Sequence, residues 1–232
     1  VVSPAFRNGK MVALFASTTH VVDIGGIGMS PDGKQVYHEG LFVPIMPLAL
    51  KGEMNEWFLN MVRANVREPV QVEGDIYALA ACNETGAARL FAMMDEYDLD
   101  DLDALGHHII EQSRTAITAK INAMPQGSWT HSMRIDGMEA PIDFVANLSI
   151  SNGQIHVDYT GSSGTSDYGI NCPMCYTEAY TAFGVKCVVA PEIPNNAGTL
   201  DAITVSAPEN TIMNAPHPCA VVARSTIGHM LP

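Results

Sequence analysis

The feature that most constrains the fold is a run of alternating residues followed by an Asn-Gly pair. Apolar side chains occupy every second position over residues 142–150, with mostly polar side chains between them. This two-residue period is typical of a β-strand with one buried face. Asn152-Gly153 then leads into a second alternating run over residues 155–159. Because Asn and Gly tolerate the positive φ angles of a tight two-residue turn, the pattern predicts an antiparallel hairpin. We expect His156 to point from this hairpin toward water.

A second hairpin is predicted at the start of the chain. Asn8-Gly9 separates residues 1–6 from the apolar run at residues 11–16, and the same turn chemistry applies. Residues 41–48 contain two prolines and favour an extended segment rather than a helix. A strand is also predicted at residues 202–206, after a loop marked by Pro191, Pro194 and Gly198.

The middle of the chain has the apolar spacing of helices. One apolar stripe contains Met54, Trp57, Phe58, Met61 and Val62. After a break at Pro69, the helical pattern resumes over residues 76–94. A third helix follows the acidic run at residues 95–103, since acidic side chains stabilise the first turn of a helix. Its expected buried side consists of Leu102, Leu105, Ile109, Ile110 and Ile117. A later helix would place Tyr176, Tyr180 and Phe183 in the core.

These patterns predict a mixed α+β fold in which antiparallel hairpins and strands accompany a central helical layer. No internal repeat or low-complexity linker interrupts the chain, so we expect residues 1–232 to form a single mixed α+β unit. The chain starts with Val1 inside an apparent strand and stops directly after an apolar stretch. We therefore expect it to be an internal portion of a longer polypeptide.

Composition excludes several classes of partner. The formal net charge is −13, with only 12 Lys and Arg residues, which argues against binding to nucleic acid phosphates. No apolar run approaches the length of a membrane span, and the N-terminus lacks the pattern of a secretory signal. We expect a soluble, cytoplasmic protein that acts on a small molecule.

The cysteines fit a reducing compartment better than a disulfide scaffold. There are five of them, an odd and sparse set. Cys172 and Cys175 have the spacing of a redox or zinc pair, but no second such pair is present. The pair therefore stays a minor alternative.

His20 and Asp23 are the first candidates for chemistry. They follow the apolar run at residues 11–16 and precede a glycine-rich loop, and ends of strands are where a scaffold commonly presents functional groups. Neutral imidazole is the commonest protein metal ligand, and Asp23 could either join the same ion or hold the ring in one tautomer. Two ligands do not complete a metal site. The alternative is a half-buried histidine bonded to backbone.

Four stretches together resemble the hydantoinase B/oxoprolinase family. They are residues 20–26 (HVVDIGG), 37–41 (YHEGL), 157–163 (VDYTGSS) with 171–173 (NCP), and 191–198 (PEIPNNAG). They occur in family order across nearly the whole chain. The family contains the B-type subunits of ATP-dependent hydantoinases and caprolactamase, the matching part of 5-oxoprolinase, and related subunits of acetone and acetophenone carboxylases.

The resemblance implies a B-type subunit of an ATP-dependent cyclic-amide hydrolase in a hetero-oligomer. Such a protein holds a divalent metal ion (Zn, Mn or Fe), while ATP is bound by a hydantoinase A-type partner. His20 matches a metal-ligand histidine, and the other ligands, an Asp and a His, would precede Val1. Asp23 is the catalytic candidate, as a ligand or as a group that orients His20. Asp158, Tyr159 and Ser162 are candidates for substrate binding, although turn chemistry explains that loop equally well.

Two other functions remain open at this stage. One is a subunit of an ATP-dependent ketone carboxylase of the acetone or acetophenone type, with which residues 19–21 and 228–230 are also compatible. The other is a non-catalytic assembly subunit that keeps the fold and packs against an ATPase.

Overall fold

The computed structural model describes residues 1–231 and confirms a mixed α+β fold. Close contacts group the described residues into two compact units. Unit 1 comprises Val1–Gly28 and Gly40–Gly106, and unit 2 comprises Met29–Glu39 and the chain from His107 onward. The chain therefore passes between the units after Gly28, after Glu39 and after Gly106.

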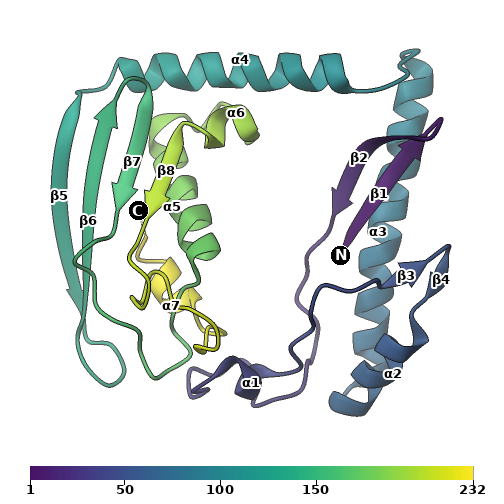
Figure 1. Cartoon of the computed structure of the whole chain (residues 1–232), viewed down its shortest axis with the longest axis horizontal. Coiled ribbons are helices and arrows are strands. Elements are labelled where there is room, and N and C mark those ends of the chain that lie inside the picture. The colour runs from purple at the N-terminus through teal and green to yellow at the C-terminus, as the bar shows by residue number, and fades with distance from the viewer. Residues whose placement is uncertain (232) are drawn as a thin grey trace. The chain divides into compact units, whose positions relative to one another are not determined.

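Unit 1 contains two β-ribbons and two complete helices (Figure 1). The elements are β1 (Val2–Arg7), β2 (Lys10–Ala16), β3 (Ala49–Leu50), β4 (Glu53–Met54), α2 (Glu56–Asn65) and α3 (Pro69–Glu96). β1 and β2 pair antiparallel, and both turn residues, Asn8 and Gly9, have positive φ. The predicted first hairpin is therefore confirmed. The short β3–β4 ribbon was not predicted.

Pro69 marks the start of α3 rather than an interruption before it. A proline fits the first turn of a helix because its missing N–H would have no partner there. α3 is consequently longer than the expected helix over residues 76–94. α2 and α3 meet in a small buried cluster made of Leu59, Val62, Val72 and Ile76.

The acidic run at residues 95–103, which begins in the last turn of α3, ties the N-terminal hairpin to the helices. Asp95 pairs with Arg7 at 2.7 Å, and Lys10 contacts Asp101 at 2.8 Å and Asp103 at 2.6 Å. Asp103 is also the first residue of the next helix, α4 (Asp103–Asn122), which confirms the predicted helix start.

Unit 2 is built on a four-stranded sheet of order β5-β6-β7-β8. Its strands are β5 (Gly127–Ile135), β6 (Ile142–Ser151), β7 (Gln154–Asp158) and β8 (Ile203–Ser206), and its other helices are α1 (Val36–Glu39), α5 (Met174–Val189), α6 (Ala197–Leu200) and α7 (Ser225–Gly228). β6 and β7 form the hairpin predicted at Asn152-Gly153. β8 lies parallel to β7, which the sequence did not indicate.

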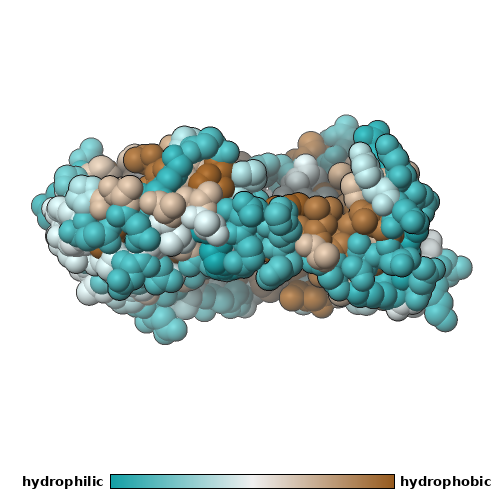
Figure 2. Space-filling model, turned by 90° about the horizontal axis from the view of Figure 1, so that it is seen from above, coloured by the Kyte–Doolittle hydropathy of each residue, from teal (hydrophilic) through white to brown (hydrophobic). Residues whose placement is uncertain are grey.

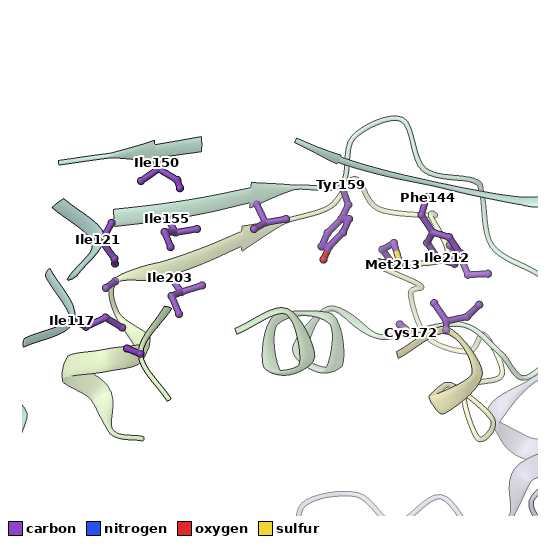
Figure 3. Close-up of a cluster of buried hydrophobic side chains, with 14 of the residues drawn as sticks. Ile117, Ile121, Phe144, Ile150, Ile155, Tyr159, Cys172, Ile203, Ile212 and Met213 are labelled. Atoms are coloured by element: carbon purple, nitrogen blue, oxygen red, sulfur yellow. The ribbon is translucent and has the colours of Figure 1, made fainter. Parts of the chain in front are cut away.

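One face of this sheet forms the main hydrophobic core (Figure 3). Phe144 and Ile150 come from β6, and Ile155 and Val157 come from β7. Helix α4 contributes two isoleucines and β8 contributes one: Ile117, Ile121 and Ile203. The alternating pattern of the hairpin therefore produces the expected buried face.

Three side chains predicted to be buried are exposed. Leu105 and Ile109 lie in the first half of α4, whereas its second half supplies Ile117 and Ile121 to the core. The helical period was correct, but only part of the helix has a sheet to pack against. Phe183 of α5 is 63% exposed, although Tyr176 and Tyr180 stack at a centroid distance of 4.2 Å.

Hydrophobic side chains also reach the surface among hydrophilic ones, as the face drawn in Figure 2 shows. In unit 1 the exposed apolar residues include Phe42, Ile45 and Leu50. Residues 41–48 form neither a helix nor a strand, in line with their prolines. Among residues 1–231, every helix is too short or too polar to cross a bilayer.

Gly198, at the start of α6, tests how closely α4 is packed. A Cβ at this position would lie 2.1 Å from the carbonyl oxygen of Ile110 and 2.9 Å from the backbone nitrogen of Arg114. We predict that Gly198→Ala lowers the free energy of unfolding by about 1–3 kcal/mol or more, because the helix must move. Thermal unfolding measures this. In the matched Gly106→Ala variant the new Cβ meets no atom within 4 Å, so it should be neutral or stabilising. Equal melting temperatures for both variants would contradict the close packing.

Candidate functional site

His20 lies on a loop that is fixed to α3 on both sides. The Ser17 hydroxyl donates to the Leu79 carbonyl oxygen at 3.0 Å, and the Val22 N–H donates to the Asp75 carboxylate at 3.0 Å. His20 is exposed between these two anchors, and its ring forms no hydrogen bond within residues 1–231. The half-buried histidine considered as an alternative is therefore not what the structure contains. The loop presents the imidazole to the surface.

Asp23 is held by Arg67. Its side chain is 9% exposed, and one oxygen contacts the guanidinium of Arg67 at 2.5 Å and accepts the Gly25 N–H at 3.0 Å. The other oxygen accepts the backbone N–H of Arg67. The Arg67 side chain, followed by its backbone N–H, holds the pKa of Asp23 well below its usual range. The carboxylate is thus ionised and engaged within its own loop.

Arg67 also closes the glycine-rich loop that follows Asp23. Its guanidinium donates to the carbonyl oxygens of Gly26 at 3.0 Å and Gly25 at 3.2 Å. Gly25 has a φ of +79°, and a Cβ there would lie 2.5 Å from the carbonyl oxygen of Asn65. The loop therefore needs glycine at this position, both for its backbone conformation and for the close approach to α2.

The described residues do not complete a metal site around His20. Within residues 1–231, no group of three or more His, Cys, Asp and Glu side chains has the arrangement needed to hold an ion. Asp23 is already paired with Arg67, so His20 would need ligands from elsewhere. The structure does not favour a metal or redox site at Cys172 and Cys175 either. Burial raises the pKa of the Cys172 thiol to about 12, which disfavours the thiolate, while Cys175 is exposed.

Asp158 belongs to a polar network on the outer face of the unit 2 sheet. One oxygen accepts the hydroxyls of Thr160 and Ser206, both at 2.9 Å. Partial burial raises the pKa of Asp158, but these hydrogen bonds outweigh it, and the pKa lies below its usual value. His156 extends the network, with one ring nitrogen 3.1 Å from the Ser206 hydroxyl and the other 2.8 Å from Thr204. His156 is half-buried, not in water as predicted, because β8 lies beside it.

Tyr159 and Ser162 have mainly internal contacts. Tyr159 points to the core side of the sheet (Figure 3), and its hydroxyl lies 2.7 Å from that of Thr181. Burial raises its pKa. The Ser162 hydroxyl accepts the Val145 N–H at 3.0 Å and donates to the Val145 carbonyl oxygen, which pins the loop to β6.

The predicted residues thus form two groups. His20 and Asp23 lie in unit 1, whereas Asp158, Tyr159 and Ser162 lie in unit 2. Of the three in unit 2, Asp158 is the one whose carboxylate belongs to an outer-face network. The roles assigned to all five side chains stay predictions.

Sequence reasoning assigned no role to two charged residues that each bond to two backbone groups in the structure. One oxygen of Glu39 accepts the N–H groups of Val221 at 2.5 Å and Val222 at 2.7 Å. Lys186 is buried and donates to the carbonyl oxygens of Ala190, at 2.9 Å, and Ile193. The sequence did point to Glu39, since this residue lies within the stretch at residues 37–41 that resembles the family. Lys186 had none, because nothing local shows that the lysine turns inward.

Comparisons with known proteins agree over almost the whole chain. The family model described as Hydantoinase B/oxoprolinase matches residues 1–231. An uncharacterized protein of Methanocaldococcus jannaschii is 30% identical over 95% of this chain and 40% of its own length. The B-type subunit of a putative D-/L-hydantoinase from Pseudomonas sp. is 26% identical over 97% of this chain and 41% of its own length. The chain thus spans about 40% of these relatives.

Two solved structures share the fold. The ATP-dependent caprolactamase of Pseudomonas jessenii aligns with a TM-score of 0.85 at 24% identity, over 96% of this chain and 39% of that one. A nucleotide-free acetone carboxylase aligns with a TM-score of 0.84 at 17% identity, over 97% and 32%. Together with the family match, these similarities confirm the resemblance inferred from the four sequence stretches. The chain belongs to the hydantoinase B/oxoprolinase family.

Proposed function

We propose that this chain is part of the B-type subunit of an ATP-dependent cyclic-amide hydrolase. The observation that carries the proposal is the family match over residues 1–231, with relatives named for hydantoin, caprolactam and 5-oxoproline. Each of these names denotes a cyclic amide. Because the hydantoinase and caprolactamase relatives are named as single subunits of larger enzymes, we propose that the protein acts in a hetero-oligomer.

The partner in this proposal is a hydantoinase A-type ATPase subunit in the cytoplasm. An amide carbonyl is a poor electrophile because the nitrogen lone pair is delocalised onto the oxygen. Transfer of the terminal phosphoryl group of ATP to that oxygen would release ADP and make the carbonyl carbon more electrophilic. Water would then add to this carbon, the C–N bond would break with protonation of the nitrogen, and a second water would hydrolyse the resulting acyl phosphate to the ring-opened acid and phosphate. The ATPase would supply this activation, and the B-type subunit would hold the substrate.

His20 is proposed as one ligand of a divalent metal ion (Zn, Mn or Fe). Its support is the exposed ring on a loop with two anchors to α3. A fixed loop lowers the entropic cost of holding a ligand in place. The remaining ligands would come from outside the described residues. When bound, a divalent ion polarises a carbonyl oxygen or activates water.

Asp23 is proposed to act on this site by positioning His20. Its carboxylate joins Arg67 and Gly25, so the glycine-rich loop directly after His20 is closed from one side. Asp158 is proposed to contact substrate, since its network faces outward from the sheet. Tyr159 and Ser162 would support that side by fixing the backbone around Asp158.

A ketone carboxylase subunit is the second candidate. The observation that favours it is the similarity in fold to acetone carboxylase. In both reactions ATP would activate an oxygen, of an amide in one case and of an enol in the other. The two functions therefore differ in the group that attacks next.

Incubation of the intact assembly with ATP separates the candidates. The panel consists of hydantoin, 5-oxoproline, caprolactam and acetone, each with and without labelled bicarbonate. We predict ring opening of at least one cyclic amide and no fixation of label. Label fixed into acetone would establish the carboxylase instead. No turnover of any compound, with an active ATPase partner present, would favour the non-catalytic assembly role.

Removal of the His20 imidazole tests the metal assignment. We predict that His20→Ala loses most of the bound metal of the intact assembly, because a ligand is removed from the ion. Elemental analysis of the purified protein measures it. His107→Ala is the matched control, since His107 is an exposed histidine on α4. Unchanged metal content in His20→Ala would remove His20 from the ligand set.

Asp23→Asn tests the positioning role. We predict a loss of about 10–100-fold in metal affinity, the size typical of groups that orient a ligand. The variant should also change the response to acid. Asp23 has a lowered pKa in the folded state, so its stabilising effect is complete above the unfolded pKa of about 4 and is lost as the pH falls below it.

The melting temperature of Asp23→Asn should therefore lie furthest below that of the wild type at neutral pH, and the gap should close in acid. Asp32→Asn is a control, because Asp32 is exposed and its side chain bonds only to Ser30 among residues 1–231. A gap that stays constant from pH 7 to pH 3 would contradict the ion pair with Arg67.

A further inference from the structure

The segment that carries His20 is attached unequally at its two ends. At the upstream end, the Ser17 N–H donates to the Val1 carbonyl oxygen at 2.9 Å, and the Ser17 hydroxyl donates to the Leu79 carbonyl oxygen at 3.0 Å. Loss of either hydrogen bond would leave the other in place. The position of the upstream end therefore does not depend on a single side chain.

The downstream end depends on Asp75. Its carboxylate accepts the Val22 N–H at 3.0 Å. Among the residues that the structure describes, this is the one hydrogen bond that joins residues 18–22 to another element. Val21 also packs against the small buried cluster of α2 and α3, but apolar packing is not directional. The bond to Asp75 thus fixes the backbone two residues after His20.

The spacing of the two attachments makes the segment bow outward. Their partners on α3, Asp75 and Leu79, are one helical turn apart, about 6 Å along the helix axis. The chain from Ser17 to Val22 could span about 17 Å if it were extended. Because the chain is longer than the gap that it bridges, it must leave the surface of α3 between the attachments. His20 lies near the middle of this stretch.

The position of Asp75 is not explained by α3 itself. The helix begins at Pro69, so Asp75 lies beyond the first turn, where an acidic side chain would stabilise the helix start. Asp is also a weaker helix former than Ala in a helix interior. Within residues 1–231, its side chain forms no other hydrogen bond or ion pair. The bond to Val22 is therefore the contact that accounts for an acidic residue here.

We propose that Asp75 is a positioning residue for His20. By holding the Val22 N–H, it sets the backbone at the downstream end of the segment and thereby the place where the imidazole is presented. The inference rests on the function proposed above, in which His20 binds a divalent metal ion. Asp75 acts through His20 and does not touch the ion. Its role is separate from that of Asp23, whose carboxylate bonds to other partners.

Hydrogen–deuterium exchange of the intact assembly tests the attachment without a metal readout. We expect the Val22 amide hydrogen to exchange about tenfold faster or more in Asp75→Ala, because a hydrogen bond to a carboxylate is lost. Asp75→Asn keeps an acceptor oxygen in a side chain of the same shape, so its exchange should stay close to that of the wild type. Glu84→Ala is the matched control, since Glu84 is an exposed acidic residue on the same helix.

A double-mutant cycle tests whether Asp75 acts through His20. The affinity of the intact assembly for Zn²⁺ is measured in the wild type, in Asp75→Ala, in His20→Ala and in the double variant. We expect Asp75→Ala to weaken Zn²⁺ binding by about tenfold or more, and to have no further effect when His20 is already replaced. A general structural role of Asp75 would weaken binding by the same factor in both backgrounds. Since Ala is the better helix former, the substitution should not destabilise α3.

Three results would overturn the positioning role. They are unchanged exchange of the Val22 amide in Asp75→Ala, unchanged Zn²⁺ affinity in that variant, and an equal loss of affinity with and without His20. A His20→Ala variant that binds Zn²⁺ as tightly as the wild type would instead refute the ligand role proposed for His20, and with it the reason for positioning that ring. The two failures are distinguishable, because only the second leaves His20→Ala unimpaired.

Discussion

The two-residue turn at Asn152-Gly153 is the constraint on which the rest of unit 2 depends. Both residues have positive φ, which fixes the pairing of β6 with β7. A slip of one residue would turn Ile155 and Val157 outward and bring Asp158 into the core. The turn therefore determines the core face and the outer polar network together.

Unit 1 has a different kind of constraint, because its candidate residue lies on a loop rather than a strand. The loop with His20 gains its order from contacts that are distant in sequence: Ser17 with Leu79, Val22 with Asp75, and Asp23 with Arg67. Both carboxylate oxygens of Asp23 accept hydrogen bonds from Arg67, which is why the carboxylate stays ionised. A loop held in this way can expose an imidazole without losing its conformation.

Local patterns predicted the fold well where neighbouring residues decide the outcome. Both Asn-Gly hairpins formed as expected, and the acidic run led into α4. The errors arose where tertiary packing decides. The period of α4 was right, but Leu105 and Ile109 have no sheet beneath them. His156 was expected in water because no pattern in β7 shows that β8 adds beside it in parallel.

For the candidate site too, the sequence predicted local features but not contacts between distant residues. Strand-end position identified His20 and Asp23, but the sequence could not show that Asp23 is paired with Arg67, 44 residues away. Glu39 was noticed only as part of a motif, and its two amide donors at Val221 and Val222 come from the far end of the chain. A contact between residues that are distant in sequence produces no periodic pattern, so it can be identified only in the folded structure.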